Sequence, residues 1–421
     1  MAVEIVHPLP VDEVEDWAAT MAVAYLDDPG DEGHRRRVED LRLSWDAERR
    51  WGARADGRWV GTLGSWDRTL TVPAYDGKPA EIPADALAMV SVAATHRRRG
   101  LLTRMLTESL RVARERGDAV SILFAAEWPI YGRFGYAPSS TTASYTLLPR
   151  SPGGSLAPSG DGSVRQVDAE QIGALAPGAF DVARHLRAGN IDRPRQWWAR
   201  RLGLGGYPSA EDGRKLPMTV VREGRGGVDG FVAWTPAGPF DVDGTSGAIE
   251  VVDLCAASDA AYRDLWAYLT GIDLVGEIRM SARPPAEPLR WLLHDGRALR
   301  QTYAGDGLWL RILDLPAALS ARRYAVADRL VLDVVDDDIG GYAAGRFVLD
   351  GGPDEAQCAP STVDSADLRV HQRALAAAYL GGFSLHGQAI TGGVDELTPG
   401  ALRRADAMFA TPHAPWCATR F

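Results

Sequence analysis

A short run of residues places an apolar strand, a basic turn and a helix in direct succession. The run reads Val90-Ser-Val-Ala-Ala-Thr-His-Arg-Arg-Arg-Gly-Leu-Leu-Thr103. A helix start exposes backbone N–H groups at the positive end of the dipole, so this turn can bind an anion such as pyrophosphate. Arg97 to Arg99 add positive charge, and Gly100 permits a phosphate to approach the backbone closely. The alternative is three solvated arginines, although cations oppose the dipole at a helix start.

Two further groups could move protons. Tyr131 opens the stretch Tyr131-Gly-Arg-Phe-Gly-Tyr136, and its phenol, with an ordinary pKa near ~10, could protonate a leaving thiolate. From the residues alone, Tyr131 could equally be a packing aromatic beside Phe134 and Tyr136. The chain ends on Trp416-Cys-Ala-Thr-Arg-Phe421, a tail apolar enough to dock against the fold. Docking would fix the free carboxylate of Phe421, or the ring of Phe421 could simply fill a hydrophobic gap.

The elements that must position these groups form a mixed α/β pattern. The apolar spacing predicts helices over 11–26 and 35–50, a strand over 59–66, a strand over 87–93, a helix over 101–116 and a strand over 120–126. Gly117 follows the helix as a typical helix-end glycine. The strand, the basic turn and the helix are therefore expected at one corner of a sheet.

The length of 421 residues predicts two or three domains, and the order of segments along the chain favours three. Residues 151–162 are rich in Gly, Pro and Ser and form the clearest linker. A second α/β segment follows without an arginine-rich turn between strand and helix, so it would lack the anion site. A third α/β segment begins at about residue 306, with a helix predicted over 365–379. The predicted domains are 1–150, 151–305 and 306–421.

Composition excludes several classes of protein. Hydrophobic residues make up 46% and charged residues 24%, as in ordinary globular proteins, while the net charge of −10 argues against binding to nucleic acid. The N-terminus lacks a signal pattern, and no apolar run is long enough to span a membrane. Three widely spaced cysteines suggest neither a disulfide framework nor a metal cluster. We therefore expect a cytoplasmic protein without membrane, nucleic-acid or metal partners.

The basic turn resembles the cofactor motif of the GCN5-related N-acetyltransferase (GNAT) superfamily. Arg97-Arg-Arg-Gly100 matches the first half of that motif, whereas Leu102 stands where the superfamily has Gly or Ala. The fuller string over 92–102, together with Ile130-Tyr-Gly-Arg-Phe-Gly-Tyr136, is similar to sequences of the enhanced-intracellular-survival (Eis) acetyltransferases. This resemblance extends over the whole chain. The resemblance implies an α/β fold with two GNAT-like domains, the second degenerate, and a C-terminal sterol-carrier-protein-like domain.

The resemblance also implies a cofactor, acetyl-CoA, and roles for individual residues. It implies Tyr131 as general acid and the Phe421 carboxylate as general base. Glu127 is a weaker, alternative candidate for the base. Val92 N–H is the candidate contact for the developing oxyanion. The residues implied in cofactor binding are Val90, Ser91, Val92, Arg98, Arg99, Gly100, Leu101, Leu102, Thr103, Ala126 and Glu127.

Other polar residues are weaker candidates. Asp27 and Asp28 could bind a substrate ammonium, or could form an ordinary solvated loop. His96 is expected beside the phosphate turn and outside the chemistry. Asp336 to Asp338 carry the charge of a metal loop without its ligand spacing, so a polar turn is predicted there.

The function predicted from the sequence is acetyl-CoA-dependent acetylation of a primary amine, by direct attack on the thioester. The amine belongs to a cationic, aminoglycoside-like small molecule or to a lysine side chain, although Arg420 beside the expected base would repel a polyamine unless an acid neutralises it. The resemblance implies a homohexamer. The alternatives are transfer of longer acyl groups and a non-catalytic acyl-CoA- or lipid-binding module.

Overall fold

In the computed structural model the chain forms two compact units. The structure describes residues 3–75, 78–209, 213, 215–238, 247–362 and 365–421. Unit 1 comprises Met1–Ser139, Leu308–Pro412 and Arg420–Phe421, and unit 2 comprises Ser140–Gly307 and His413–Thr419. The chain thus leaves unit 1 twice and returns to it with its last two residues.

Unit 1 contains a seven-stranded sheet in its described part, with the order β1-β2-β3-β4-β5-β14-β6. Its strands are β1 (Val3–Val6), β2 (Arg50–Ala55), β3 (Arg58–Thr71), β4 (Glu81–Val92), β5 (Val120–Phe124), β14 (Leu308–Ile312) and β6 (Ala137–Pro138). Its helices are α1 (Val14–Ala24), α2 (Glu32–Leu43), α3 (Leu101–Arg116) and α4 (Trp128–Tyr131), with short 3-10 turns at Val11–Glu13, Ala47–Arg49, Ala94–His96 and Gly132–Phe134. Among the described strands of this sheet, only β4 and β5 pair in parallel, and the crossover helix α3 joins them.

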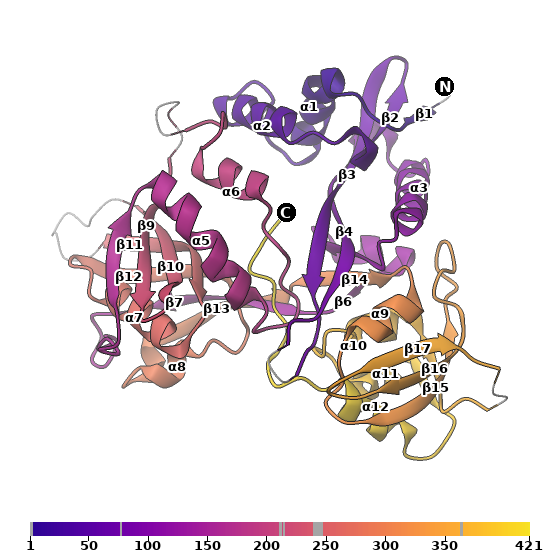
Figure 1. The fold of residues 1–421 in the computed structure, drawn as a ribbon. Coiled ribbons are helices and arrows are strands. Elements are labelled where there is room, and N and C mark those ends of the chain that lie inside the picture. The colour runs from indigo at the N-terminus through magenta and orange to yellow at the C-terminus, as the bar shows by residue number, and fades with distance from the viewer. Residues whose placement is uncertain (1–2, 76–77, 210–212, 214, 239–246, 363–364) are drawn as a thin grey trace. The chain divides into compact units, whose positions relative to one another are not determined.

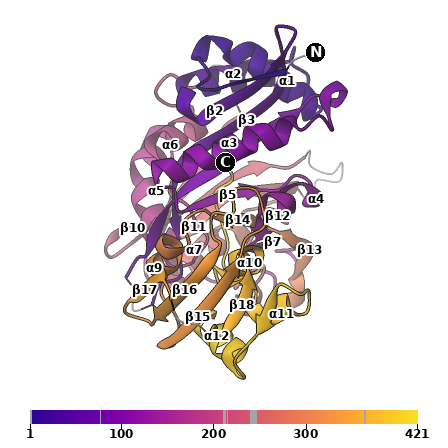
Figure 2. The same cartoon turned by 90° about the vertical axis from the view of Figure 1, so that its right-hand side faces the viewer.

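Helix α3 is held by one apolar face. Leu101, Met105, Leu106, Leu110 and Ala113 are buried against the sheet, and Figure 2 shows α3 running across it. The helix begins after Gly100 and ends at Gly117, both with left-handed backbone conformations. This packing fixes where the basic turn meets the end of β4.

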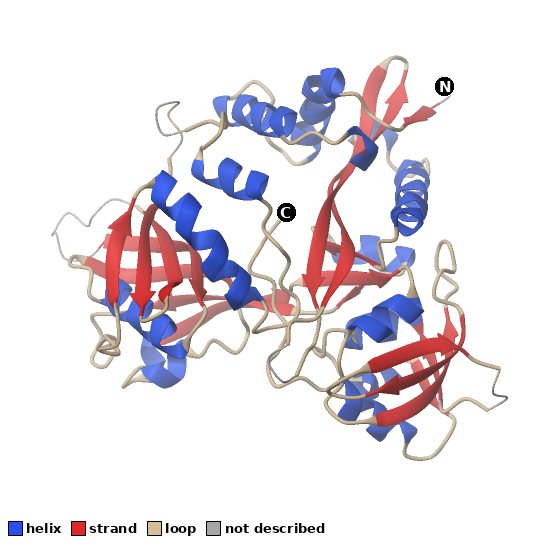
Figure 3. Cartoon of the chain, viewed as in Figure 1, coloured by secondary structure: helices blue, strands red, loops and turns tan. Residues whose placement is uncertain are grey.

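Unit 1 also contains a five-stranded sheet, with the order β17-β16-β15-β18-β19 in the described part. Its strands are β15 (Asp328–Val335), β16 (Gly345–Gly351), β17 (Ala356–Pro360), β18 (Leu368–His371) and β19 (Val394–Glu396). Its helices are α9 (Leu315–Ala321), α10 (Gln372–Ala378), α11 (Leu385–Ala389) and α12 (Ala401–Phe409), which Figure 3 draws in blue beside the strands. The helix predicted over 365–379 is wrong at its start, because Leu368–His371 pairs in parallel with β15.

Unit 2 repeats the architecture of the first sheet. Its seven described strands have the order β13-β7-β12-β11-β10-β9-β8 (Figure 1). They are β7 (Thr141–Leu147), β8 (Ser163–Val167), β9 (Met218–Gly224), β10 (Gly227–Pro236), β11 (Gly247–Ala256), β12 (Val275–Arg283) and β13 (Leu299–Asp306). The helices are α5 (Ala169–Arg184), α6 (Arg195–Leu202), α7 (Asp259–Thr270) and α8 (Leu289–Leu292), with a 3-10 turn at Gly296–Ala298. Strands β11 and β12 pair in parallel and are connected by α7, as β4 and β5 are connected by α3.

Two strands lie in sheets other than those suggested by the predicted limits at 150/151 and 305/306. β7 precedes the first limit but pairs with β12 and β13. β14 follows the second limit but pairs with β5 and β6. The division into 1–150, 151–305 and 306–421 remains a prediction, and sheet membership crosses both of its limits.

Within the described residues, no helix combines the length and the apolar character needed to cross a membrane.

Candidate active site

Strands β4 and β5 separate at the position where the sequence predicts the site. Their parallel pairing ends at Ala86 and Ile122, whereas β4 continues to Val92. A cavity of about 640 Å³ opens between the diverging ends. It is lined by Ala24, Tyr25, Val90, Ser91, Val92, His96, Arg97, Arg98, Gly100, Leu101, Leu102, Thr103, Ala126, Glu127, Ile130, Tyr131 and Arg133. The cavity therefore joins the end of β4, the start of α3 and the segment after β5.

A bulge in β4 turns the backbone of this strand toward the cavity. The β3–β4 register shifts between Thr62 and Gly64, and Met89 has φ +56°. Beyond the bulge, Ala93 N–H donates to Val60 O (2.9 Å) next to the Gly61–Val92 pair, which is therefore a non-hydrogen-bonded pair. The N–H of Val92 consequently points away from β3 and toward the side where β5 has diverged.

The start of α3 presents backbone donors and cations together. No side chain caps this start among the described residues, so the first-turn amides have no partner within the helix. Gly100 has φ +74°, a left-handed conformation that favours glycine, with open space around its Cα. In the described chain, Arg97 and Arg98 form no hydrogen bond or ion pair, while Arg99 Nη2 donates to Thr95 O (3.2 Å) and lies outside the lining. The corner suits a diphosphate chemically.

Tyr131, in the segment after β5, also lines the cavity. It is the last residue of α4, only 7% exposed, with its ring 6.0 Å from that of Tyr136 in an edge arrangement. Burial raises the pKa of Tyr131, and the nearby Tyr25 and Glu127 raise it further. No hydrogen bond of its hydroxyl occurs in the part of the chain that the structure describes, so the proton is free for a ligand in the cavity.

Tyr25 is a cavity residue that the sequence did not identify. Its hydroxyl donates to Val90 O (3.0 Å) at the β4 bulge, while Thr62 Oγ1 donates to Met89 O (2.7 Å) from the neighbouring strand. Burial raises the pKa of Tyr25, and the bond to Val90 opposes that rise. The two hydroxyls therefore hold the carbonyls of the bulge on either side.

Comparisons with known proteins identify the domains and the family of this chain. Two family models, each described as Acetyltransferase (GNAT) domain, match residues 6–139 and 189–312, and a model described as Sterol carrier protein domain matches 315–418. An uncharacterized N-acetyltransferase of Streptomyces avermitilis is 38% identical over 99% of this chain and 98% of its own. N-acetyltransferase Eis of Mycobacterium tuberculosis is 33% identical over 86% of this chain and 85% of its own. The crystal structure of Eis1 from Mycobacterium abscessus superposes with a TM-score of 0.82 and 30% identity, covering all of both chains.

This chain belongs to the Eis family of N-acetyltransferases. The predicted fold class, two GNAT domains followed by a sterol-carrier-like domain, is confirmed. The protein is an acetyltransferase enzyme, and its fold implies an acyl-CoA donor. The donor fits the cavity, because open amides and unpaired arginines face the place for a diphosphate and the diverging strands leave an edge for an extended chain.

The C-terminal residues of this Eis-family chain lie against the end of β5. The ring of Phe421 is 5.2 Å from that of Phe124, and the guanidinium of Arg420 lies 5.0 Å from the centre of the same ring. Phe124 is two residues before Ala126 in the cavity wall. Phe421 itself is not a lining residue, so its role as general base remains a prediction.

The predicted acidic residues differ in their positions. Glu127 lines the cavity and is exposed. Asp27 pairs with Arg37 (2.6 Å) and Asp28 accepts from Gly30 N (2.8 Å), and neither lines the cavity. Their role in substrate binding remains a prediction, with each carboxylate already bonded locally.

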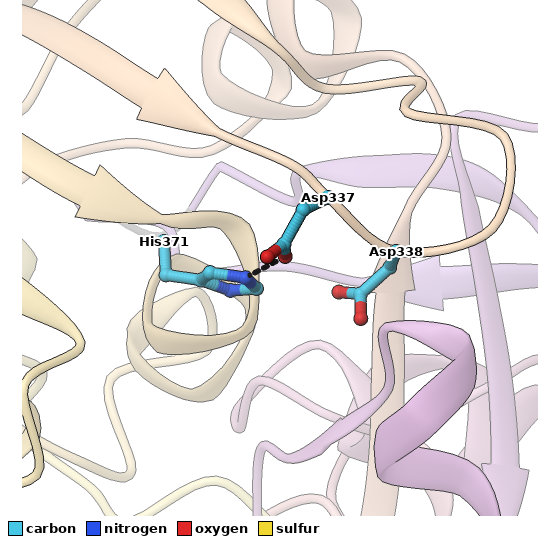
Figure 4. A group of neighbouring side chains, drawn as sticks. All are labelled: Asp337, Asp338 and His371. Atoms are coloured by element: carbon cyan, nitrogen blue, oxygen red, sulfur yellow. Dashed lines mark hydrogen bonds and ion pairs between the residues drawn. The ribbon is translucent and has the colours of Figure 1, made fainter.

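The acidic run near residue 336 forms a hydrogen-bonded turn with a histidine beside it. Asp336 accepts from the amides of Asp338 and Ala343. Figure 4 shows Asp337 bonded to His371 Nε2 (2.7 Å), with Asp338 nearby. Because His371 Nδ1 accepts from the amide of Arg373, Nε2 carries the proton that bonds to Asp337. That proton leaves no lone pair on Nε2 for a metal.

Proposed function

We propose that this protein transfers an acetyl group from acetyl-CoA to a primary amine of a cationic, aminoglycoside-like small molecule or a lysine side chain. The observation that carries the proposal is that Val92, the open start of α3 and Tyr131 all line one cavity. Bound acetyl-CoA supplies an acetyl thioester, whose carbonyl carbon accepts the amine and whose sulfur leaves as a thiolate. The chain must therefore bind the diphosphate, stabilise negative charge and move protons.

The start of α3 is assigned to the diphosphate. Its free amides would accept the phosphate oxygens, and Arg97 and Arg98 would add electrostatic attraction without losing an existing partner. The N–H of Val92 would donate to the carbonyl oxygen as negative charge develops there. The direction of this amide, set by the bulge, supports that role.

We assign to Tyr131 the role of proton donor to the leaving sulfur. Its raised pKa keeps the hydroxyl protonated throughout the neutral range, so a hydrogen-bond donor is always present. The same raised pKa makes full proton transfer uphill, and donation of a hydrogen bond comes first as the thiolate forms.

We assign to the Phe421 carboxylate the role of general base toward the substrate amine. A terminal carboxylate has an ordinary pKa of about 3.3 to 3.7, so it acts by attracting the ammonium and by relaying its proton through water. The ring contact with Phe124, beside the cavity wall, supports this role. Glu127 is the alternative base within the lining.

The experiment that tests this function measures turnover of acetyl-CoA with polyamines, aminoglycosides and lysine peptides. Tyr131→Phe should lower kcat by about 10²-fold, in the range of lost general-acid catalysis, with unchanged CoA affinity. Tyr303→Phe, an exposed tyrosine on β13, is the matched control. A protein that binds CoA yet acetylates none of these amines would support the alternative of a binding module, and a preference for longer acyl-CoA would support the other alternative.

The family resemblance extends the proposal to assembly and location. We infer a homohexamer in the cytoplasm, and light scattering of the purified protein tests the assembly directly.

A further inference from the structure

Unit 2 has a cavity of its own, of about 510 Å³. It lies where β11 and β12 diverge, since their parallel pairing ends at Val251 and Met280 whereas the strands continue to Ala256 and Arg283. The start of α7 and the end of α5 complete the walls. The cavity therefore occupies the same topological position in unit 2 as the acyl-CoA cavity in unit 1.

The helix start that corresponds to the diphosphate site of unit 1 carries a side-chain cap in this second cavity. Ser258 Oγ accepts from Ala261 N (3.1 Å), so the start of α7 has a side-chain cap. The same hydroxyl donates to Asp229 (2.7 Å), and Asp259 adds a second carboxylate in the first turn. Asp229 is neutralised by Arg222 (2.7 Å), so Asp259 is the carboxylate of the lining at this helix start. The side-chain cap and the charge of Asp259 both disfavour a diphosphate, so the cavity is unsuited to coenzyme A.

Most charged groups of the wall already have partners. Arg283 pairs with Glu287 (3.0 Å), whose other oxygen accepts from the Tyr262 hydroxyl. Asp253 pairs with Arg193 (2.7 Å). These bonds satisfy the carboxylates of Glu287 and Asp253.

Arg187 differs from the other cations of the wall. Its guanidinium lines the cavity and, among the described residues, takes part in no hydrogen bond or ion pair. Burial lowers the pKa of Arg187, and the neighbouring cation Arg283 lowers it further against the attraction of Glu287. A partly buried guanidinium without an acceptor is costly, and an oxyanion in the cavity would supply the missing partner.

The other walls are apolar and include the C-terminal tail. Phe180, Leu254 and Trp416 provide apolar surface. Two hydrogen bonds fix Trp416: its backbone N–H donates to Ala188 O (3.0 Å), and its indole N–H donates to Ala282 O (2.8 Å).

The loop that carries Arg187 is bonded to the same tail. Asn190 donates to the carbonyl of Arg187 and accepts from Ala418 N (2.9 Å). A ligand on Arg187 would therefore contact a segment that is hydrogen-bonded to the tail.

We propose that the unit 2 cavity binds a small molecule with an apolar body and one carboxylate or phosphate group, held by Arg187 and covered on one side by Trp416. The volume is in the range of ligand sites, which is about 300 to 1,000 Å³. Among the described lining residues, Arg187 is the one cation without a partner, which matches a single acid group, and the aromatic walls match an aryl or alkyl body.

Three probes that differ only in their head group test the site in the full-length protein. We would titrate 4-bromobenzoate, 4-bromophenyl phosphate and the neutral 4-bromobenzamide by calorimetry, and locate bromine by anomalous diffraction from soaked crystals. At least one anion should bind with bromine beside Trp416, and the amide should bind about tenfold more weakly or not at all. Which anion binds better separates a carboxylate ligand from a phosphate ligand. Absence of binding by both anions up to about 10 mM, or bromine elsewhere, would overturn the proposal.

Variants separate the guanidinium from the general charge of unit 2. Arg187→Gln should weaken the anion about tenfold or more, and Arg187→Lys should retain part of the affinity. Arg263→Gln, an exposed arginine on α7 outside the cavity, is the matched control and should bind like the wild type. Equal binding by Arg187→Gln and the wild type, with melting curves showing both folded, would contradict the assignment.

A second readout concerns the tail and rests on the proposed function. Residues 413–419 belong to unit 2 and continue covalently into Phe421, the proposed base. Saturating anion should therefore change kcat for amine acetylation at least twofold in the wild type and leave Arg187→Gln unchanged. If the enzyme acetylates amines but ignores the bound anion, the link through the tail is wrong. If it acetylates nothing, the proposed function fails while the calorimetry still tests the cavity.

Discussion

The ring of Phe421, the last residue of the chain, lies 5.2 Å from the ring of Phe124, the last residue of β5. This contact places Phe421 beside the strand that leads into the proposed acyl-CoA cavity. A carboxylate there has a fixed position only while Phe421 remains the final residue.

Adding one glycine after Phe421 therefore tests the terminal base. The extension moves the carboxylate by one residue, about 3.5 Å, and should lower kcat at least tenfold. CoA affinity should stay unchanged, because the start of α3 is untouched. The measurement is steady-state acetylation beside calorimetry with CoA.

The matched variant for the extension is Glu127→Gln. Glu127 lines the cavity and is the alternative base, so its replacement should leave most of the activity if Phe421 is the base. Full activity of the extended chain combined with loss in Glu127→Gln would reverse the assignment.

Tyr25→Phe tests the support of the β4 bulge. The substitution removes the 3.0 Å bond from the hydroxyl to Val90 O and keeps the ring. One hydrogen bond contributes about 1 kcal/mol, so KM for acetyl-CoA should rise about fivefold with a smaller change in kcat. An equal fall in kcat with unchanged KM would instead indicate that Tyr25 acts in the chemical step.

Two buried thiols predict a pH dependence of stability. Burial raises the pKa of Cys255 and of Cys358 to about 12, from about 9 for an ordinary thiol. Between pH 9 and 10 the native state therefore holds protons that the unfolded chain has lost. The free energy of unfolding should fall with rising pH, by at most about 1.4 kcal/mol per pH unit for each thiol.

Denaturant titrations at pH 8, 9 and 10 measure that slope. The double variant Cys255→Ala and Cys358→Ala should show a shallower fall than the wild type over the same range. Identical slopes would mean that the thiols titrate normally in the native protein.

The cavity corner could be predicted because its signals are local in the sequence. The strand, the arginines, Gly100 and α3 follow one another within 90–116, and their order alone defines the corner. The position of Tyr131 followed from the aromatic turn after β5.

Long-range pairing could not be predicted in this way. The apolar patterns of β7 and β14 identify strands without stating which sheet each joins. Tyr25 was missed because its hydroxyl bonds to a carbonyl 65 residues away. The helix predicted over 35–50 ends at Leu43, since Trp45 packs edge-on against Trp17 and β2 begins at Arg50.

The most direct test of the diphosphate site at the start of α3 is the affinity of coenzyme A for Thr103→Asp. Thr103 lies in the first turn of α3 and lines the cavity. A carboxylate at this position is stabilised by the helix dipole, so the fold is kept, but it repels the diphosphate. Thr107→Asp, one turn along and outside the lining, is the control. Calorimetry should show CoA binding to the wild type and to Thr107→Asp, and at least tenfold weaker binding to Thr103→Asp in a protein of undiminished thermal stability. Equal CoA affinity in all three proteins, or none in the wild type, would contradict a diphosphate site at the start of α3.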